Sequence, residues 1–181
     1  MNDPYRDLRY PIDNPKMEGF VMSRPIYETL DHINGEVDVM KEYARLKDLT
    51  YQKLPKLSHF DYVVLSCEGE PCCYMVEIKI RECSVDSFRN YMLSMKKIEA
   101  AKHLEAAGFK AYILVRWSDA TGMARMINYS YEGVGGRNDR NDPQDIEPVA
   151  YFDIKKSFAV RRQTNATRQN ASRQPELTVC E

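Results

Sequence analysis

The sequence predicts an α/β fold, with a mixed central sheet that is flanked by helices. Two β-rich segments, residues 60–66 and 73–80, are separated by turn residues and predict a hairpin. A long segment of helical period, residues 84–107, leads into the apolar segment 111–117. A helix of that length can join two parallel strands, so the sheet is expected to contain parallel and antiparallel pairs.

The composition is typical of a single domain with less ordered ends. The chain has 181 residues and a net charge of −1, which excludes a protein that coats DNA through charge alone. We expect an extended arm over residues 1–22, a folded domain over 23–158 and a disordered, partly basic tail over 159–181. No apolar run approaches the roughly 18 residues that cross a bilayer, and no signal peptide is evident, so a cytoplasmic protein without a membrane partner is expected.

The cysteines and glycines exclude other kinds of site. Five cysteines, an odd number without an export signal, favour free thiols in a reducing compartment. None of their spacings is that of zinc ligands. No glycine-rich phosphate-binding loop is present either, so no nucleotide cofactor is expected.

The first helix is expected to begin near Ser23, a suitable N-cap, with Pro25 in its first turn, and to end near Lys47. Gly35 interrupts its pattern, which leaves open one bent helix or two short ones. The buried stripe is expected to consist of apolar residues at spacings of three and four: Ile26, Leu30, Ile33, Val37, Met40 and Ala44.

The next elements are predicted from turns and periodicity. Residues 68–71 read Glu-Gly-Glu-Pro and form the turn of the hairpin. The helix 84–107 carries apolar residues at helical spacing and should end before Gly108. The strand 111–117 is apolar almost throughout and should be buried on both faces.

Beyond this strand the pattern is weaker. Residues 119–122 predict a turn and residues 123–129 a further strand. Residues 132–145 are rich in Gly, Asn and Asp and predict a loop, while residues 149–154 predict a last edge strand.

Three charged side chains are expected to meet on the hairpin. Glu77 and Lys79 are two residues apart in a strand, so both point to one face while Ile78 points to the other. A turn centred between residues 69 and 70 sets Asp61 opposite Ile78. A shift of half a residue sets Asp61 opposite Glu77 or Lys79 and on their face.

Two carboxylates this close repel each other unless a cation lies between them. Magnesium prefers such oxygen ligands, and manganese can replace it. The metal can acidify a bound water and neutralise charge on a phosphodiester, while Lys79 orients the water or stabilises the transition state. Asp61, Glu77 and Lys79 thus predict a metal-dependent phosphodiester hydrolase. The alternative is a solvated edge strand that carries a Glu/Lys pair.

The order of these residues resembles the PD-(D/E)xK nuclease superfamily and, more narrowly, small nuclease-like proteins of bacteriophages. The resemblance is carried by Glu36, Asp61 and the segments 77–81 (EIKIR), 94–97 (SMKK) and 117–119 (WSD). It is closest between Leu57 and Trp117, where Phe60 replaces the proline of the motif's name. It implies a restriction-endonuclease-like αβββαβ core and an endonuclease that uses magnesium and acts on DNA.

By the same resemblance, Glu36 is the carboxylate of the first helix that reaches the metal or its waters, and Glu28 and Glu42 compete for this role. Lys97 on the second helix is expected to contact a phosphate, and Arg81 to hold a DNA phosphate as a bidentate donor. For Glu36 and Lys97 the alternative is a solvated surface side chain.

The expected function is therefore a metal-dependent nuclease that hydrolyses DNA phosphodiester bonds, in the host cytoplasm if a phage encodes it. One rival is a catalytically silent nuclease fold that binds DNA or a protein partner. Another is a nuclease-fold subunit that needs a partner to recognise its target, and a homo-oligomer is also open.

Overall fold

The computed structural model describes residues 30–136 and 146–163. The predicted arm, the predicted helix start at Ser23 and Pro25, and Glu28 lie outside the described residues. The helices and strands follow one another as α1 (Leu30–Lys47), β1 (Leu49–Lys53), β2 (Tyr62–Cys67), β3 (Glu70–Ile80), β4 (Asn90–Ser94), α2 (Met95–Ala106), β5 (Lys110–Arg116), β6 (Ala120–Arg125), β7 (Tyr131–Gly135), β8 (Glu147–Asp153), α3 (Ile154–Ser157) and β9 (Ala159–Arg162).

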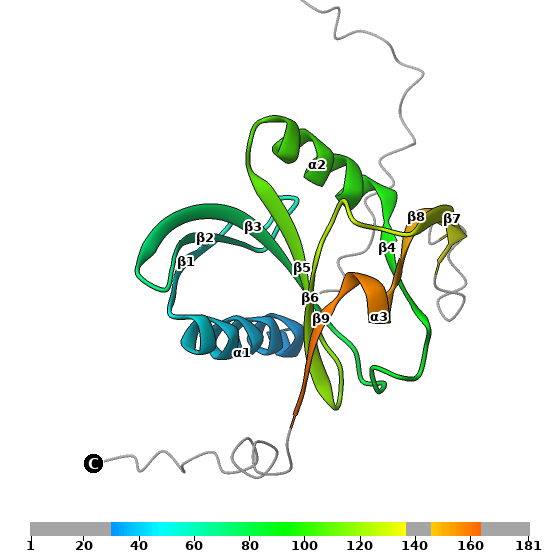
Figure 1. The fold of residues 1–181 in the computed structure, drawn as a ribbon, viewed down its shortest axis with the longest axis horizontal. Helices are drawn as coiled ribbons and strands as arrows, with labels where there is room; N and C mark the ends of the chain where they lie inside the picture. Colours follow the sequence, from blue (N-terminus) through cyan, green and yellow to red (C-terminus); the bar gives the residue numbers. More distant parts are fainter. Residues whose placement is uncertain (1–29, 137–145, 164–181) are drawn as a thin grey trace, which may run out of the picture.

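Six strands form the central sheet, in the order β1-β2-β3-β5-β6-β9. β3 and β5 are parallel, and every other neighbouring pair of this sheet is antiparallel. Figure 1 shows α1 and α2 on opposite sides of the sheet, with α2 in the connection that joins the two parallel strands. The predicted mixed central sheet with flanking helices is confirmed.

α1 packs on one face of the sheet as a single helix, so the alternative of two short helices interrupted at Gly35 is excluded. Met40 and Ala44 are buried as predicted, together with Val39, which the predicted stripe missed. A side-chain carbon at Gly35 would lie 2.8 Å from Cδ1 of Ile80. The glycine therefore permits α1 to approach the end of β3 closely.

α2 packs on the other face through Ile98 and Ala101. It ends as predicted, because Gly108 has a φ of 87°, which glycine adopts without strain. β5 lies between the two helices and contributes to both cores, with Ile113 on the α2 side and Leu114 on the α1 side. The predicted burial of this strand on both faces is confirmed.

The predicted helix over residues 84–107 is wrong in its first half. Tyr91 and Leu93 are buried in β4 while their neighbours are half-buried, which is the period of a strand. β4 pairs with β8, and this pairing outweighs the local helical spacing. Ser94 then caps α2, since its side chain accepts a hydrogen bond from the first turn. Phe88, expected on the buried stripe, lies exposed on the preceding loop.

β4, β8 and β7 form a second sheet, with β8 in its centre. The prediction of a loop is wrong for residues 132–135, which belong to β7, and β8 is not an edge strand. The glycines here serve packing, because side-chain carbons at Gly133 and Gly135 would lie 3.1 Å and 2.8 Å from atoms of Tyr151. Tyr131 also stacks on Tyr151, with ring centroids 4.8 Å apart.

Two boundaries near the end of the domain are corrected as well. β6 begins at Ala120 and ends at Arg125, because a tighter turn precedes it, in which Trp117 N donates to Ala120 O at 2.8 Å. Residues 159–162 were expected to be disordered, but they form β9, which pairs with β6 at the edge of the central sheet. The rest of the predicted tail, from residue 164, lies outside the described residues.

The cysteines in the described part of the chain, Cys67, Cys72, Cys73 and Cys83, are all free, as predicted. Among the described helices, none combines the length and the apolar character that crossing a membrane requires.

Candidate active site

The hairpin of β2 and β3 places the two acidic residues side by side. Its turn consists of residues 68 and 69, with φ of 54° and 81°, so the predicted centre was one residue too far along the chain. A bulge in β3 then shifts the register, and Tyr62 lies opposite Val76. Asp61 precedes Tyr62 and comes next to Glu77, which is one of the arrangements that the sequence left open.

Asp61 is held by the backbone of β3. Its N–H donates to Val76 O at 3.0 Å, and its Oδ2 accepts from Ile78 N at 2.7 Å. These two bonds fix the carboxylate at the start of β2 and leave its second oxygen available.

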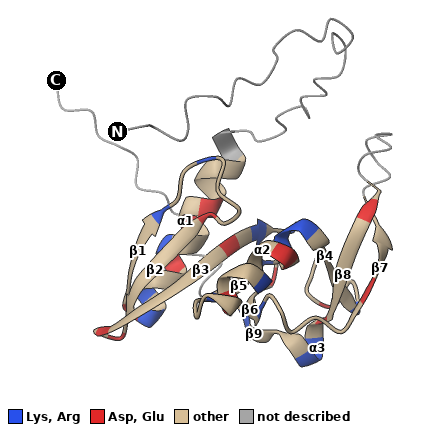
Figure 2. Ribbon diagram, turned by 90° about the horizontal axis from the view of Figure 1, so that it is seen from above, with Lys and Arg blue, Asp and Glu red and all other residues tan. Residues whose placement is uncertain are grey.

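Glu77 is completely buried and lies on the α2 side of β3, opposite to Val76 and Ile78, as the strand period predicts. Two ammonium groups neutralise it. Lys79 Nζ lies 2.5 Å from Oε1, and Lys97 Nζ lies 2.8 Å from Oε2. Figure 2 shows acidic residues in red and basic residues in blue on β3, at the end of the strand that lies beside α2.

Lys97 also joins the helix to the start of β2, because its Nζ donates to His59 O at 2.6 Å. The ammonium group thus connects α2 to β3 and to the segment that leads into β2. The alternative of a solvated surface lysine does not hold for Lys97, whereas its predicted phosphate contact stays a prediction.

The site holds two carboxylates and two ammonium groups close together: Asp61, Glu77, Lys79 and Lys97. Burial raises the pKa of Asp61 above its ordinary value, and the negative charge of Glu77 raises it further. Burial alone would lower the pKa of Lys79, but the carboxylates of Glu77 and Asp61 outweigh it and raise that pKa. The lysine is therefore held in its charged form by the carboxylates that it neutralises.

The acidic pair suits a divalent metal. Glu77 Oε1 is buried, and among the described residues its close partner is the ammonium group of Lys79 at 2.5 Å. Within residues 30–136 and 146–163, no group of three His, Cys, Asp or Glu side chains is close enough to hold a metal. Asp61 and Glu77 thus offer two carboxylates, the number with which magnesium is often bound beside water and substrate oxygens.

Glu36 is not brought into this pair. It lies on α1, where its Oε2 is 3.6 Å from Lys53 Nζ. Burial would lower the pKa of Lys53, but Tyr62, Glu36 and Asp61 together raise it. Glu42, the alternative to Glu36 as the carboxylate of the first helix, pairs with Arg116.

Arg81 lies two residues beyond Lys79 and is engaged with β4. One of its nitrogens donates to Tyr91 Oη at 3.0 Å, and its guanidinium lies 5.3 Å from the centre of that ring. Tyr91 was expected on a helix, and its place beside Arg81 follows from the pairing of β4 with β8. Local periodicity carries no signal for that pairing.

Asp119, the last residue of the WSD segment, has a structural role. Its carboxylate accepts from Ser84 Oγ at 2.7 Å and from Val85 N at 2.9 Å, which ties down the loop between β3 and β4. Arg162 of β9 lies 3.4 Å from the same carboxylate.

A mixed sheet whose central hairpin carries a buried acidic pair and a lysine, with helices on both faces, defines a restriction-endonuclease-like protein. Residues 22–160 match the family model described as "Phage putative PDDEXK endonuclease", and the chain belongs to this family. A search of curated proteins gave no match. The matched range contains Asp61, Glu77 and Lys79.

Proposed function

We propose that the protein is a metal-dependent endonuclease that hydrolyses DNA phosphodiester bonds, with magnesium as its metal and manganese as a substitute. The observation that carries the proposal is the buried carboxylate of Glu77 between Lys79 and Lys97, beside Asp61. Taking a carboxylate and its ammonium partners out of water carries a desolvation cost that their attraction often does not repay, so stability alone does not explain this arrangement. The family description supports an endonuclease of phage origin, and we propose DNA as its substrate and the host cytoplasm as its location.

Each residue has a proposed role. Asp61 and Glu77 bind the divalent cation, which acidifies the attacking water and neutralises charge on the phosphate. Lys79 stabilises the negative charge that develops on the phosphate oxygens. Lys97 positions Glu77 and the segment before β2, and it is proposed to contact a flanking phosphate.

Two further residues complete the proposal. Arg81 borders the site through Tyr91 and is proposed to hold a flanking phosphate. Glu36 is proposed to act from a distance, by fixing Lys53 next to Asp61.

The experiment is cleavage of linear, circular and single-stranded DNA with magnesium or manganese. Wild type is compared with Lys79→Ala and Asp61→Ala, and Lys102→Ala on α2, which pairs with exposed Glu99, is the control. We expect cleavage that requires the metal, a loss of at least 100-fold in both site variants, and no loss in the control. Cleavage of circular DNA identifies an endonuclease.

A catalytically silent fold that binds DNA or a protein is the rival, and metal binding separates the two. A module without an active site gains no thermal stability from magnesium or manganese, whereas a metal-binding site does. Absence of both cleavage and metal-induced stabilisation would refute the enzymatic proposal.

A further inference from the structure

A pocket of about 280 Å³ lies beside the candidate active site. The loop between β3 and β4 forms one wall, through Phe88, and β4 forms another, through Asn90 and Tyr91. Trp117 closes it from the end of β5, and Arg81 lies on the side of the site. Phe88 is the exposed ring of the pocket, whereas Tyr91 and Trp117 are buried and present only their edges to it. An exposed ring beside an aromatic wall, with a cation at one end, suits a flat, polar ring.

The pocket borders the candidate active site through Arg81, which lines it. Arg81 follows Lys79 by two residues and donates to the hydroxyl of Tyr91. Tyr91 also contributes to raising the pKa of Lys79. A phosphate bound at Lys79 would therefore have the next part of its own strand within reach of this pocket.

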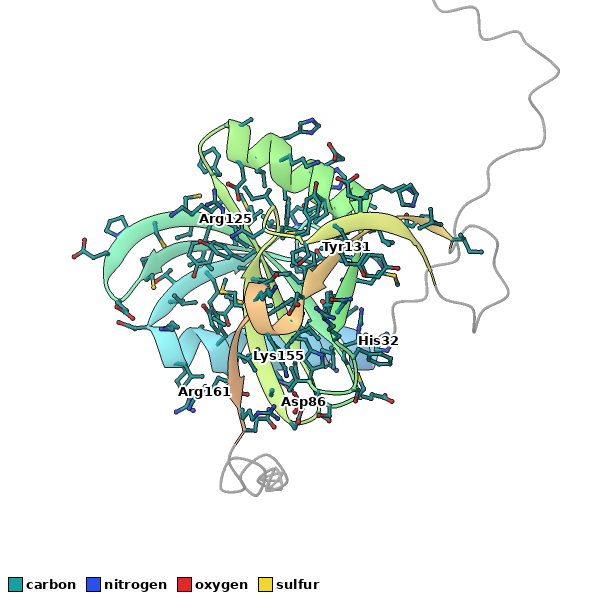
Figure 3. All side chains as sticks on the ribbon, turned by 45° about the vertical axis from the view of Figure 1, so that its right-hand side comes forward. His32, Asp86, Arg125, Tyr131, Lys155 and Arg161 are labelled. Carbon is teal, nitrogen blue, oxygen red and sulfur yellow. The ribbon has the colours of Figure 1, made fainter. Side chains whose placement is uncertain are left out.

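Phe88 is 67% exposed, although the loop that carries it is well anchored. Asp119 binds Ser84 and Val85 at the start of this loop, and Asp86 in its middle pairs with Arg162 at 2.5 Å. Asp86, in the loop between β3 and β4, is labelled near the foot of Figure 3. A large apolar ring held in water by an ordered loop is available for stacking.

The pocket also has a polar group for the edge of a bound ring. Asn90 donates through Nδ2 to Tyr131 Oη at 3.1 Å, and its side-chain oxygen has no hydrogen-bond partner among the described residues. Tyr131 begins β7, which is separated from β4 by β8, and Figure 3 labels it well away from Asp86. The amide is thus oriented by a side chain from across the second sheet and keeps one acceptor for a ligand.

We propose that this pocket binds an unpaired nucleobase next to the scissile phosphate, and that the preferred substrate is DNA with at least one unpaired nucleotide at the cut. The inference rests on the proposed nuclease function and adds its substrate class. Bases of an intact duplex are paired and stacked inside the helix, so they do not reach such a pocket without being extruded. A single strand presents its bases freely, and aromatic side chains stack on them whatever their identity.

The test uses the full chain and a single strand whose cutting position has been mapped. An abasic nucleotide is then moved along the strand, one position at a time. In wild type we expect one position next to the cut where the missing base lowers kcat/KM about tenfold, the loss typical of one base–aromatic stack. A duplex with a short unpaired stretch at the cut should be cleaved at least tenfold faster than the fully paired duplex.

The same strands are tested with Phe88→Ala. This variant should cleave the intact strand about tenfold more slowly and should no longer respond to the abasic position, because the base has lost its partner. Phe109→Ala, which removes another ring that is 41% exposed but lies outside the pocket, is the control and should behave like wild type.

Equal cleavage of paired and unpaired DNA, or an abasic effect that persists unchanged in Phe88→Ala, would overturn the pocket and leave the nuclease intact. If wild type cuts no substrate, the nuclease proposal fails on its own. Binding of the intact and abasic strands, measured by fluorescence anisotropy without metal, then tests whether the pocket binds a nucleobase. Equal binding of the two strands overturns it, and weaker binding of the abasic strand in wild type alone supports it.

Discussion

At the scale of single residues, the site depends on how Glu77 is neutralised. This carboxylate is fully buried. Lys97 reaches it from α2 and donates to Glu77 and to His59 O. Removing one partner of a buried ion pair leaves the other charge unpaired, which is more costly than the pair is favourable. Lys97 is therefore a stabilising residue of the metal-free protein as well as a proposed site residue.

The substitution Lys97→Met tests this. In metal-free buffer it should lower the free energy of unfolding by about 2 kcal/mol, because Glu77 loses a cation in a buried setting. Magnesium should then restore more stability to the variant than to wild type, since Lys79 is then the one lysine of the pair that still competes for Glu77. Denaturant unfolding with and without magnesium measures both effects. Lys102→Met is the control, and an unchanged free energy of unfolding in Lys97→Met would contradict the assignment.

At the scale of elements, the loop between β3 and β4 is held by one carboxylate. Hydrogen bonds from Ser84 and Val85, together with Arg162, hold the pKa of Asp119 below its ordinary value. A lowered pKa means that the ionised form stabilises the fold. This stability is fully present above the pKa of an unfolded Asp, about 3.9, and is lost as the pH falls through the lower pKa of the folded state.

Asp119→Asn should therefore lower the free energy of unfolding by about 1 kcal/mol at pH 7. The difference from wild type should shrink as the pH falls below about 4, because the wild-type carboxyl group then takes up its proton. Urea unfolding at a series of pH values measures it. Asp38→Asn, at an exposed position on α1, is the matched control. A difference that is constant from pH 7 to pH 3 would show that the charge is not responsible.

At the scale of the whole molecule, the balance of charge limits how DNA is bound. With a net charge of −1, the protein has no general attraction for a polyanion. Binding must come from a few cationic groups at the site, of which Lys79, Arg81 and Lys97 are the proposed ones.

The affinity for single-stranded DNA should consequently depend weakly on salt. About three phosphate contacts predict a slope of log K against log salt concentration of roughly −2. Titrations between low and moderate sodium chloride, monitored by fluorescence anisotropy, give this slope. A slope steeper than about −5 would point to a wider basic surface than the one proposed.

The sequence predicted those parts of the fold and of the site that depend on neighbours close along the chain. The face shared by Glu77 and Lys79 follows from the strand period, and the position of Asp61 follows from a short hairpin. The bulge in β3 has no such signal, so the register was left open. β4 and β7 were missed because each is specified by its pairing with the distant β8, which local periodicity does not show.

The two carboxylates lie on one local hairpin, whereas Lys97 reaches them only when α2 has crossed the sheet and β5 has paired with β3. This sets an order of events during folding. The hairpin closes a short loop and forms early, while the parallel pairing of β3 and β5 is slow. For a time Asp61 and Glu77 therefore face each other with Lys79 as their cation and without Lys97. A divalent cation in the refolding solution can then take the place of Lys97 and speed the assembly of the sheet.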